Sequence, residues 1–399
     1  MKHENGFTLV ELLISMTVLL IVVSAAVGAL VQAQRVTQGV ALEANMQEDL
    51  RAGLHFMVRD LAQAGEGVPQ GGIMVPYTNA AVPATIIRPG AGGASFSSSY
   101  AALPPVIPGD QAGQAATGVN PKTGAVITTN AILTDIITVL YADNTLVDST
   151  ANAYSLNQFP VNASPCTAGG GTITASGSSL TLSKTCFTMP ASQPTIVAGD
   201  LIMFNCAAGT ALQFVTSVNG QTINFAKGDP AGLNGLSTTT YPNGTVANLV
   251  ASGDPITITR IWMVTYYEDS TTNPLRPQLV RQVNYPNYPS AATATYPAQP
   301  IGEAIEDLQF TYDIINSSAP NGTYPNGPGD ATSPNLAYDS PLQIRAVNVF
   351  LAGRSEYPYA TSSSLQYLHN NLSTQVSIRN LSFVNQFNTS PNATQVTAP

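Results

Sequence analysis

The first 30 residues contain the feature that most constrains the fold. A short polar start, MKHENG, is followed by an apolar run over residues 7–30 in which Glu11 is the only charge. As a helix, this run is about 36 Å long, which is enough to cross a hydrocarbon core of about 30 Å. The run is longer than the apolar part of a secretory signal, and helical sequence continues through AVGALVQAQRV. We therefore expect a retained membrane-spanning helix that has an acid inside it.

The helical pattern continues well beyond the apolar run. Over residues 31–64 apolar side chains recur at steps of three and four residues, and polar side chains occupy the other faces. The helix should stop near Gly65, where several glycines and Pro69 follow. The sequence thus predicts one helix over residues 7–64, with its second half buried along one stripe. The stripe comprises Val36, Val40, Met46, Leu50, Leu54, Met57, Val58 and Leu61.

The remaining residues, 65–399, have the composition of a β-rich body with long polar loops. Only 9% of the whole chain is charged, against roughly a quarter in an ordinary soluble protein. Residues 65–130 are predicted to be loop-like, with short strands around 73–76 and 84–88. Asn219-Gly220 predicts a tight hairpin turn. Longer strands are predicted at 134–141, 179–189, 200–205, 211–218, 222–226, 256–269, 279–284, 308–314, 344–353 and 375–383. The predicted fold class is α+β, a long helix packed on an antiparallel sheet with loop insertions.

Composition also argues against several classes of function. The net charge is −9 and there is no basic run, so no nucleic-acid partner is expected. The three histidines, His3, His55 and His369, are too few and too scattered for a catalytic or multi-histidine metal site. We expect no enzyme activity, no cofactor and no metal site. The loops at 228–235 and 326–335 lack the spacing of a calcium-binding loop, which favours ordinary turns.

The three cysteines, Cys166, Cys186 and Cys206, are evenly spaced by 20 residues. Outside the cytoplasm they would give one disulfide and one free thiol. A Cys166–Cys186 bond would close a hairpin around a GGG turn. A pair that includes Cys206, or three unpaired thiols, remains an alternative.

The segment from Gly6 to Glu11, GFTLVE, resembles the class III signal of type IV pilins and type II secretion pseudopilins. The resemblance implies that a prepilin peptidase cuts between Gly6 and Phe7 and methylates the new amine of Phe7. Glu11 would then be the fifth residue, which in this family is expected to meet the N-terminal amine of a neighbouring subunit. Pairing with the Phe7 amine of its own chain remains an alternative. Physical chemistry agrees, since glycine fits a tight protease pocket. An ionised carboxylate in hydrocarbon also needs a partner.

Other segments resemble the PilW-type minor pilins. VRDLAQAG resembles that family's helix end, and DIITVLYAD, GDLIMFN, EAIEDLQFTYDI and IRAVNVFLAGRSE resemble its sheet segments in the same order. The PulJ-like minor pseudopilins share the N-terminus and helix end but usually have a shorter body. At the helix end, Asp60 or Arg59 is expected to tie the helix to the sheet or to a neighbouring pilin.

The resemblance implies a pilin-like fold and a role in assembly. The chain would comprise a leader (1–6), a transmembrane half-helix (7–30), an amphipathic half-helix (31–64) and an extracytoplasmic body (65–399). It would lie in the inner membrane with its body in the periplasm, and then in a pilus at the cell surface. Its partners would be the prepilin peptidase, other minor and major pilins and inner-membrane lipid. The implied role is initiation or tip formation of a type IV pilus. Two alternatives remain, a minor pseudopilin of type II secretion and a pilus-displayed adhesin module.

Overall fold

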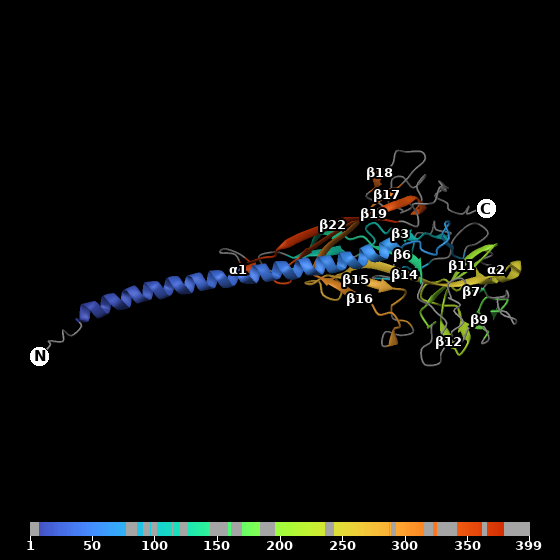
Figure 1. The fold of residues 1–399 in the computed structure, drawn as a ribbon, viewed down its shortest axis with the longest axis horizontal. Helices are drawn as coiled ribbons and strands as arrows, with labels where there is room; N and C mark the ends of the chain where they lie inside the picture. Colours follow the sequence, from blue (N-terminus) through green and yellow to red (C-terminus); the bar gives the residue numbers. More distant parts are fainter. Residues whose placement is uncertain are drawn as a thin grey trace.

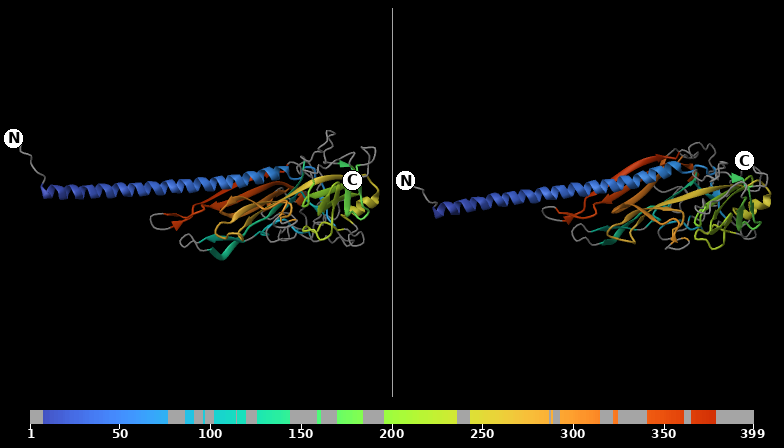
Figure 2. Two further views of the ribbon diagram at one scale, coloured as in Figure 1. Left: turned by 90° about the horizontal axis from the view of Figure 1, so that it is seen from below. Right: turned by 60° about the horizontal axis from the view of Figure 1, so that its bottom comes forward.

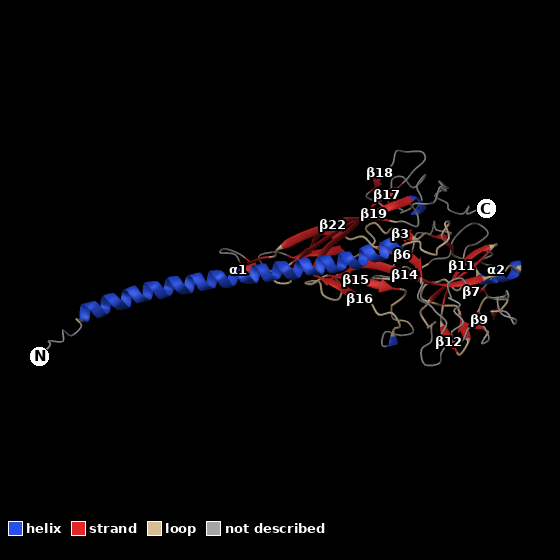
Figure 3. Ribbon diagram, in the orientation of Figure 1, coloured by secondary structure: helices blue, strands red, loops and turns tan. Residues whose placement is uncertain are grey.

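A computed structural model gives the architecture of the chain. It describes residues 8–76, 86–90, 96, 102–113, 115–119, 126–143, 159–160, 170–183, 196–235, 243–286, 288, 293–314, 322–324, 341–360 and 365–378. Helix α1 (Leu9–Gln63) projects far beyond a β-rich body, and only its C-terminal part lies against the strands (Figures 1 and 2). Figure 3 shows how strongly strands dominate that body. The α+β class predicted from the sequence is confirmed.

Both ends of α1 follow from local sequence. Thr8 caps the N-terminus from an extended conformation, and Glu11 completes a capping box. At the other end Gly65 has a φ of 82°, a left-handed conformation that glycine adopts without steric cost. The Gly65 N–H donates to the Leu140 carbonyl at 2.9 Å, which ties the helix end to a strand. The helix therefore ends where the glycines predicted.

Burial along α1 divides the helix into two parts. Met46, Leu50, Met57 and Leu61 are buried against the body, as the predicted stripe requires. The prediction was wrong for the first two stripe positions, because Val36 and Val40 remain 51% and 62% exposed. The body reaches this level of α1 from another side, where Tyr359 lies over Gly39.

The largest sheet is organised around β14 (Thr257–Asp269). Its strand order is β11-β10-β14-β15-β16, and β6 also pairs with β14, in every case antiparallel. The flanking strands are β3 (Val106–Ile107), β6 (Ile137–Ala142), β7 (Phe159–Pro160), β10 (Leu201–Cys206), β11 (Gly209–Phe214), β15 (Gln278–Val283) and β16 (Gln299–Glu303). The central strand is long because TITRIWMVTYYED contains β-branched and aromatic residues almost throughout.

A second antiparallel sheet packs beside the first and shares its core with α1. Its order is β18-β17-β19-β22, and the label positions in Figure 1 show β19 and β22 lying along α1. Its strands are β17 (Ile305–Ile314), β18 (Gly322–Tyr324), β19 (Ile344–Arg354) and β22 (His369–Ser377). The shared core joins the α1 stripe to side chains such as Tyr266, Leu279, Phe310 and Leu351. Each fully buried side chain of this size stabilises the fold by about 1.5–3 kcal/mol.

A third antiparallel sheet, β12-β13-β9-β8, lies at the end of the body away from the projecting helix (Figure 1). The hairpin of β12 (Ser217–Asn219) and β13 (Thr222–Asn224) turns at Gly220, whose φ is 60°, as Asn219-Gly220 predicted. The other two strands are β8 (Gly171–Ile173) and β9 (Ser179–Leu182), and α2 (Val246–Ser252) contributes to the same core.

Most predicted strands occur within a few residues of their expected positions, and four differences remain. The segment predicted as 211–218 is split at Val215 and Thr216 between β11 and β12. Strand β22 begins at His369, six residues before the predicted start. Residues 65–130 include more strand than expected, and α2 had no strong signal. Strand β1 (Ile73–Met74) lies within the short strand expected around 73–76. The additional short strands are β2 (Ala102–Leu103), β4 (Ala115–Val119), β5 (Val126–Leu133), β20 (Tyr359–Ala360) and β21 (Leu365–Gln366), with a 3-10 turn at Pro341–Gln343.

Candidate functional site

The N-terminal end of α1 places Glu11 against Thr8. The Thr8 backbone N–H and hydroxyl both donate to Oε2 of Glu11, at 3.0 and 2.9 Å. In return the Glu11 N–H donates to the Thr8 hydroxyl at 3.4 Å. The predicted processing residues Gly6 and Phe7 lie outside the described residues. The carboxylate predicted to act in assembly is therefore held within its own chain by the residue that caps the helix.

The surroundings of Glu11 are apolar and exposed. Its side chain lies at one end of a shallow groove on the helix surface, lined by Ile14, Ser15, Val18, Leu19 and Val22. Hydroxyl groups along the run bond back to the helix, for example Ser15 to the Leu12 carbonyl at 2.9 Å. Among the described residues, α1 is the one helix long and apolar enough to cross a membrane. This part of α1 can satisfy its own polar groups and leave an apolar surface for lipid or other helices.

At the opposite end of α1, a buried carboxylate joins the helix to the large sheet. Asp60 is fully buried, and its Oδ2 accepts from Nε of Arg281 on β15 and from the hydroxyl of Tyr266 on β14, both at 2.6 Å. The hydroxyl of Tyr141 on β6 lies 3.4 Å from Oδ1. Three strands and one helix thus meet at one side chain. This contact confirms the expected link between the helix end and the sheet.

Arg59 also reaches Asp60, although adjacent helix residues do not normally face each other. Its Nε lies 3.3 Å from Oδ1 of Asp60, and its guanidinium stacks over Phe56 at 5.2 Å. The Arg59 side chain is 49% exposed, whereas that of Arg281 is 11% exposed. Because exposed pairs contribute little, Arg281 supplies most of the charge compensation.

The electrostatics of this junction follow from burial beside a carboxylate. Burial and the negative charge of Asp60 raise the pKa of Tyr141 to about 12, and the same causes raise the pKa of Tyr266 still further. Desolvation by itself would lower the pKa of Arg281, but the hydrogen bond and the charge of Asp60 outweigh it and raise that pKa. Both tyrosines therefore remain neutral donors and Arg281 remains a cation throughout the physiological range.

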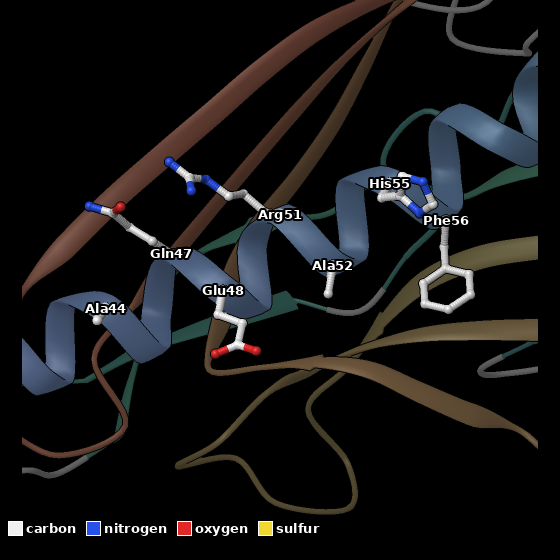
Figure 4. Close-up of a pocket in the computed structure, with 7 residues that line it drawn as sticks. All are labelled: Ala44, Gln47, Glu48, Arg51, Ala52, His55 and Phe56. Atoms are coloured by element: carbon white, nitrogen blue, oxygen red, sulfur yellow. The ribbon is translucent and has the colours of Figure 1, made fainter.

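A second surface feature lies on the outer face of α1 between these two ends. It is a shallow depression lined by Ala44, Gln47, Glu48, Arg51, Ala52, His55 and Phe56, all from α1. Figure 4 shows these side chains fanning out from the helix, with Gln47 and Arg51 on one side and Glu48 and Phe56 on the other. The arrangement is that of an open contact face, with no converging groups that would bind a small molecule.

The remaining candidate residues have simpler roles. In the loop at 228–235, the two Asp229 carboxylate oxygens each accept a backbone N–H, from Leu233 and Asn234, both at 2.9 Å. This loop is the turn that the sequence favoured. The second loop, at 326–335, lies outside the described residues. Cys206 is a free, half-buried thiol at the end of β10, while Cys166 and Cys186 also lie outside the described residues.

Sequence reasoning missed Thr8 as the partner of Glu11, although a signal was present. Thr8-Leu9-Val10-Glu11 has the S/T-x-x-E spacing of a capping box immediately before an apolar run. It also missed Tyr141, Tyr266 and Arg281 as partners of Asp60. These residues lie 81 to 221 positions away in the chain, and only the folded sheet brings them together.

Comparison with known proteins bears on the N-terminus alone. No curated protein and no solved structure matches the chain. Residues 1–27 match the family model of the prokaryotic N-terminal methylation motif. This match covers Gly6, Phe7, Thr8 and Glu11 together with most of the apolar run. It supports a type IV pilin-like prepilin, in which the methylation motif begins a membrane-capable helix that continues into an antiparallel β body.

Proposed function

We propose that the protein is a minor pilin of a type IV pilus that acts in the initiation complex or at the pilus tip. The observation that carries this proposal is the prepilin methylation motif on a helix whose first half makes no contact with its own body. The resemblance of the sheet segments, in order, to those of PilW-type minor pilins supports a pilus over the alternative, a minor pseudopilin of type II secretion. The protein would act through assembly, with no catalysis of its own.

The proposed maturation begins in the inner membrane. The short leader stays in the cytoplasm, the apolar half of α1 spans the bilayer, and the body lies in the periplasm. A prepilin peptidase cuts between Gly6 and Phe7 and methylates the Phe7 amine. Lipid and the other pilins are then the partners of the exposed helix, and the body is carried to the cell surface.

Glu11 would guide entry into the filament. The two bonds from Thr8 both reach Oε2, so Oε1 can accept from the cationic amine of a neighbouring subunit without breaking the capping box. Such a charge-assisted bond is strong where water is scarce. The local bond would thus orient the carboxylate for the bond between subunits.

Maturation can be measured directly. Mass spectrometry of the protein isolated from cells that contain the prepilin peptidase should find N-methylated Phe7 at the N-terminus. Cells that lack the peptidase provide the control and should yield the uncut chain. An intact Met1 in the presence of the peptidase, or a cut near Ala33, would contradict the prepilin assignment.

Substitution of Glu11 separates assembly from maturation. Glu11→Ala should leave cleavage and methylation intact, because the scissile bond is unchanged, but should reduce the number of surface filaments by at least about tenfold through loss of the intersubunit ion pair. Glu11→Asp, with a shorter side chain, should give an intermediate result. Wild-type filament numbers in Glu11→Ala cells with normal processing would rule out this role.

The pilus and pseudopilus alternatives call for a different measurement. The protein should be detected in sheared surface filaments, and its loss should lower pilus number while secretion of exoproteins continues. The reverse pattern would favour the pseudopilin. Binding of the protein to cells or glycans while pilus number is unchanged would favour the adhesin alternative.

A further inference from the structure

The outer edge of the sheet beside α1 is unusually regular. β22 is the last strand in the order β18-β17-β19-β22, and all nine of its residues pair with β19 without a register shift. Among the described strands it is the longest one at a sheet edge. An exposed strand edge presents a row of backbone donors and acceptors that another chain can pair with.

The hydrogen-bond pattern shows which groups face outward. The Ile378 N–H donates to the Arg345 carbonyl, and the Leu368 carbonyl accepts from the Ser355 N–H. The backbone N–H and C=O groups of the even-numbered residues therefore point toward β19. Because the bonding direction alternates along an antiparallel strand, odd-numbered residues aim their N–H and C=O groups at the free edge. All the odd side chains are exposed. They are His369, Asn371, Ser373, Gln375 and Ser377.

The three other end strands in the strand orders of the two largest sheets, β16, β11 and β18, carry features that discourage pairing. β16 contains Pro300, and its pairing with β15 has a register shift. β18 is only three residues long, and α2 packs against β11. The sequence of β22, HNNLSTQVS, contains no Lys, Arg, Asp, Glu or Pro. From Asn370 onward it therefore lacks the charge, proline and bulge by which edge strands usually avoid association. The one titratable side chain of β22, His369, is its first residue and pairs with Glu306 at 2.8 Å.

The direction of β22 limits what can pair with it. Gly353, near the end of β19, lies by Leu50 of α1, and Tyr359, six residues later, lies by Gly39. The chain therefore approaches the N-terminal end of α1 as it leaves β19, which means that β19 and α1 run in opposite directions. β22 is antiparallel to β19 and thus runs parallel to α1. Two copies joined symmetrically through β22 would have opposed α1 helices. Subunits inserted in one membrane with the same polarity cannot meet in that way.

We propose that the β22 edge accepts an antiparallel, uncharged strand from a neighbouring pilin subunit whose helix runs parallel to α1. This inference rests on the proposed function, because the filament is what brings such a neighbour alongside. The incoming strand runs toward the membrane and bonds to the outward groups at 373, 375 and 377, because the Asn371 N–H already donates to Oδ1 of Asn370 at 2.8 Å. Its side chains are of the Ser, Thr, Asn and Gln type, which match the polar odd-numbered side chains of β22. Residues 370–377 of β22 offer no ion-pair partner to a charged incoming strand, which favours an uncharged one.

Residue-resolved hydrogen exchange tests the inference on the full-length protein, free in detergent and in isolated filaments. In the free subunit the even amides of β22 should be protected, while the amides of Ser373, Gln375 and Ser377 should exchange rapidly. In filaments these three odd amides should become protected by at least about tenfold. Odd amides that are protected already in the free subunit would mean that the chain covers its own edge. Odd amides that stay unprotected in filaments containing the protein would equally overturn the inference.

Three variants of Ser373 test the same edge in cells. Ser373→Pro removes an outward N–H and should leave the bonds to β19 in place, while incorporation into filaments should fall about tenfold for a lost backbone bond. Ser373→Ala keeps the N–H and should behave as wild type, and Ser373→Lys adds a blocking charge. Equal incorporation of all three variants would refute the edge contact. Absence of the wild-type protein from filaments would instead refute the proposed function itself.

Discussion

Replacing Asp60 by Ala should lower the free energy of unfolding by about 3–5 kcal/mol, the usual cost of leaving a buried charge without its partner. The substitution would strand the Arg281 guanidinium and remove the acceptor of Tyr266 and Tyr141. The loss should appear as a lower midpoint in urea unfolding of the full-length protein in mild detergent, with tryptophan fluorescence as the signal. Trp262 lies on β14, the strand that also carries Tyr266.

The neighbouring residue provides the control for this experiment. Arg59→Ala removes an exposed partner of the same carboxylate, and such pairs contribute about 0–1 kcal/mol. The two variants should therefore differ several-fold in their effect. Losses of equal size would mean that Arg281 does not carry the compensation.

Replacing Glu268 by Gln should remove a pH-dependent loss of stability. Glu268 is fully buried on β14. Burial, with a smaller contribution from the charge of Asp269, raises its pKa to about 8, whereas a hydrogen bond from Ser270 lowers it. Because this pKa lies above its ordinary value of 4.5, the folded state binds more protons between these two values. The contribution of Glu268 to stability is therefore fully present at low pH and is lost as the pH rises from about 4.5 to about 8.

The free energies of unfolding of the wild type and of Glu268→Gln should therefore be equal at low pH and differ at high pH. At pH 4 the Gln variant should match the wild type, and near pH 9 it should be more stable by on the order of 5 kcal/mol. The control is Glu43→Gln on the exposed surface of α1, which makes the same chemical change without removing a buried carboxylate. Asp135, whose pKa burial raises to about 7, should leave a residual slope in the same direction. Parallel curves for wild type and Glu268→Gln would contradict this assignment.

Local chemistry in the sequence was enough to predict the helix and most strands. The end at Gly65 depends on a left-handed glycine, and the Asn219-Gly220 hairpin depends on a turn that few other residue pairs allow. The start of α1 at Leu9 was also encoded, by Thr8 and Glu11. Each of these elements is decided within a few residues, so a single sequence reveals it.

Features that depend on distant contacts were not predictable in the same way. Val36 and Val40 follow the same period as Met46, yet the body covers α1 fully only from Met46 onward. The partners of Asp60 come from three strands, and no local pattern selects them. The split between β11 and β12 likewise reflects a change from one sheet to another at Val215 and Thr216, which strand propensity by itself does not specify.

The unbroken course of α1 into the body has a mechanical consequence. Since the helix passes from its exposed apolar part to the Asp60 junction without a break, the body is attached to a rigid lever about 82 Å long. A tilt of only about 5° at the N-terminal end would move the Asp60 end by about 7 Å, by the geometry of a straight rod of that length. A small change in the tilt of the N-terminal part of α1 would therefore change the position of the β22 edge. Because the buried Asp60–Arg281 ion pair fixes the end of α1 to the sheet, the body would move together with the helix.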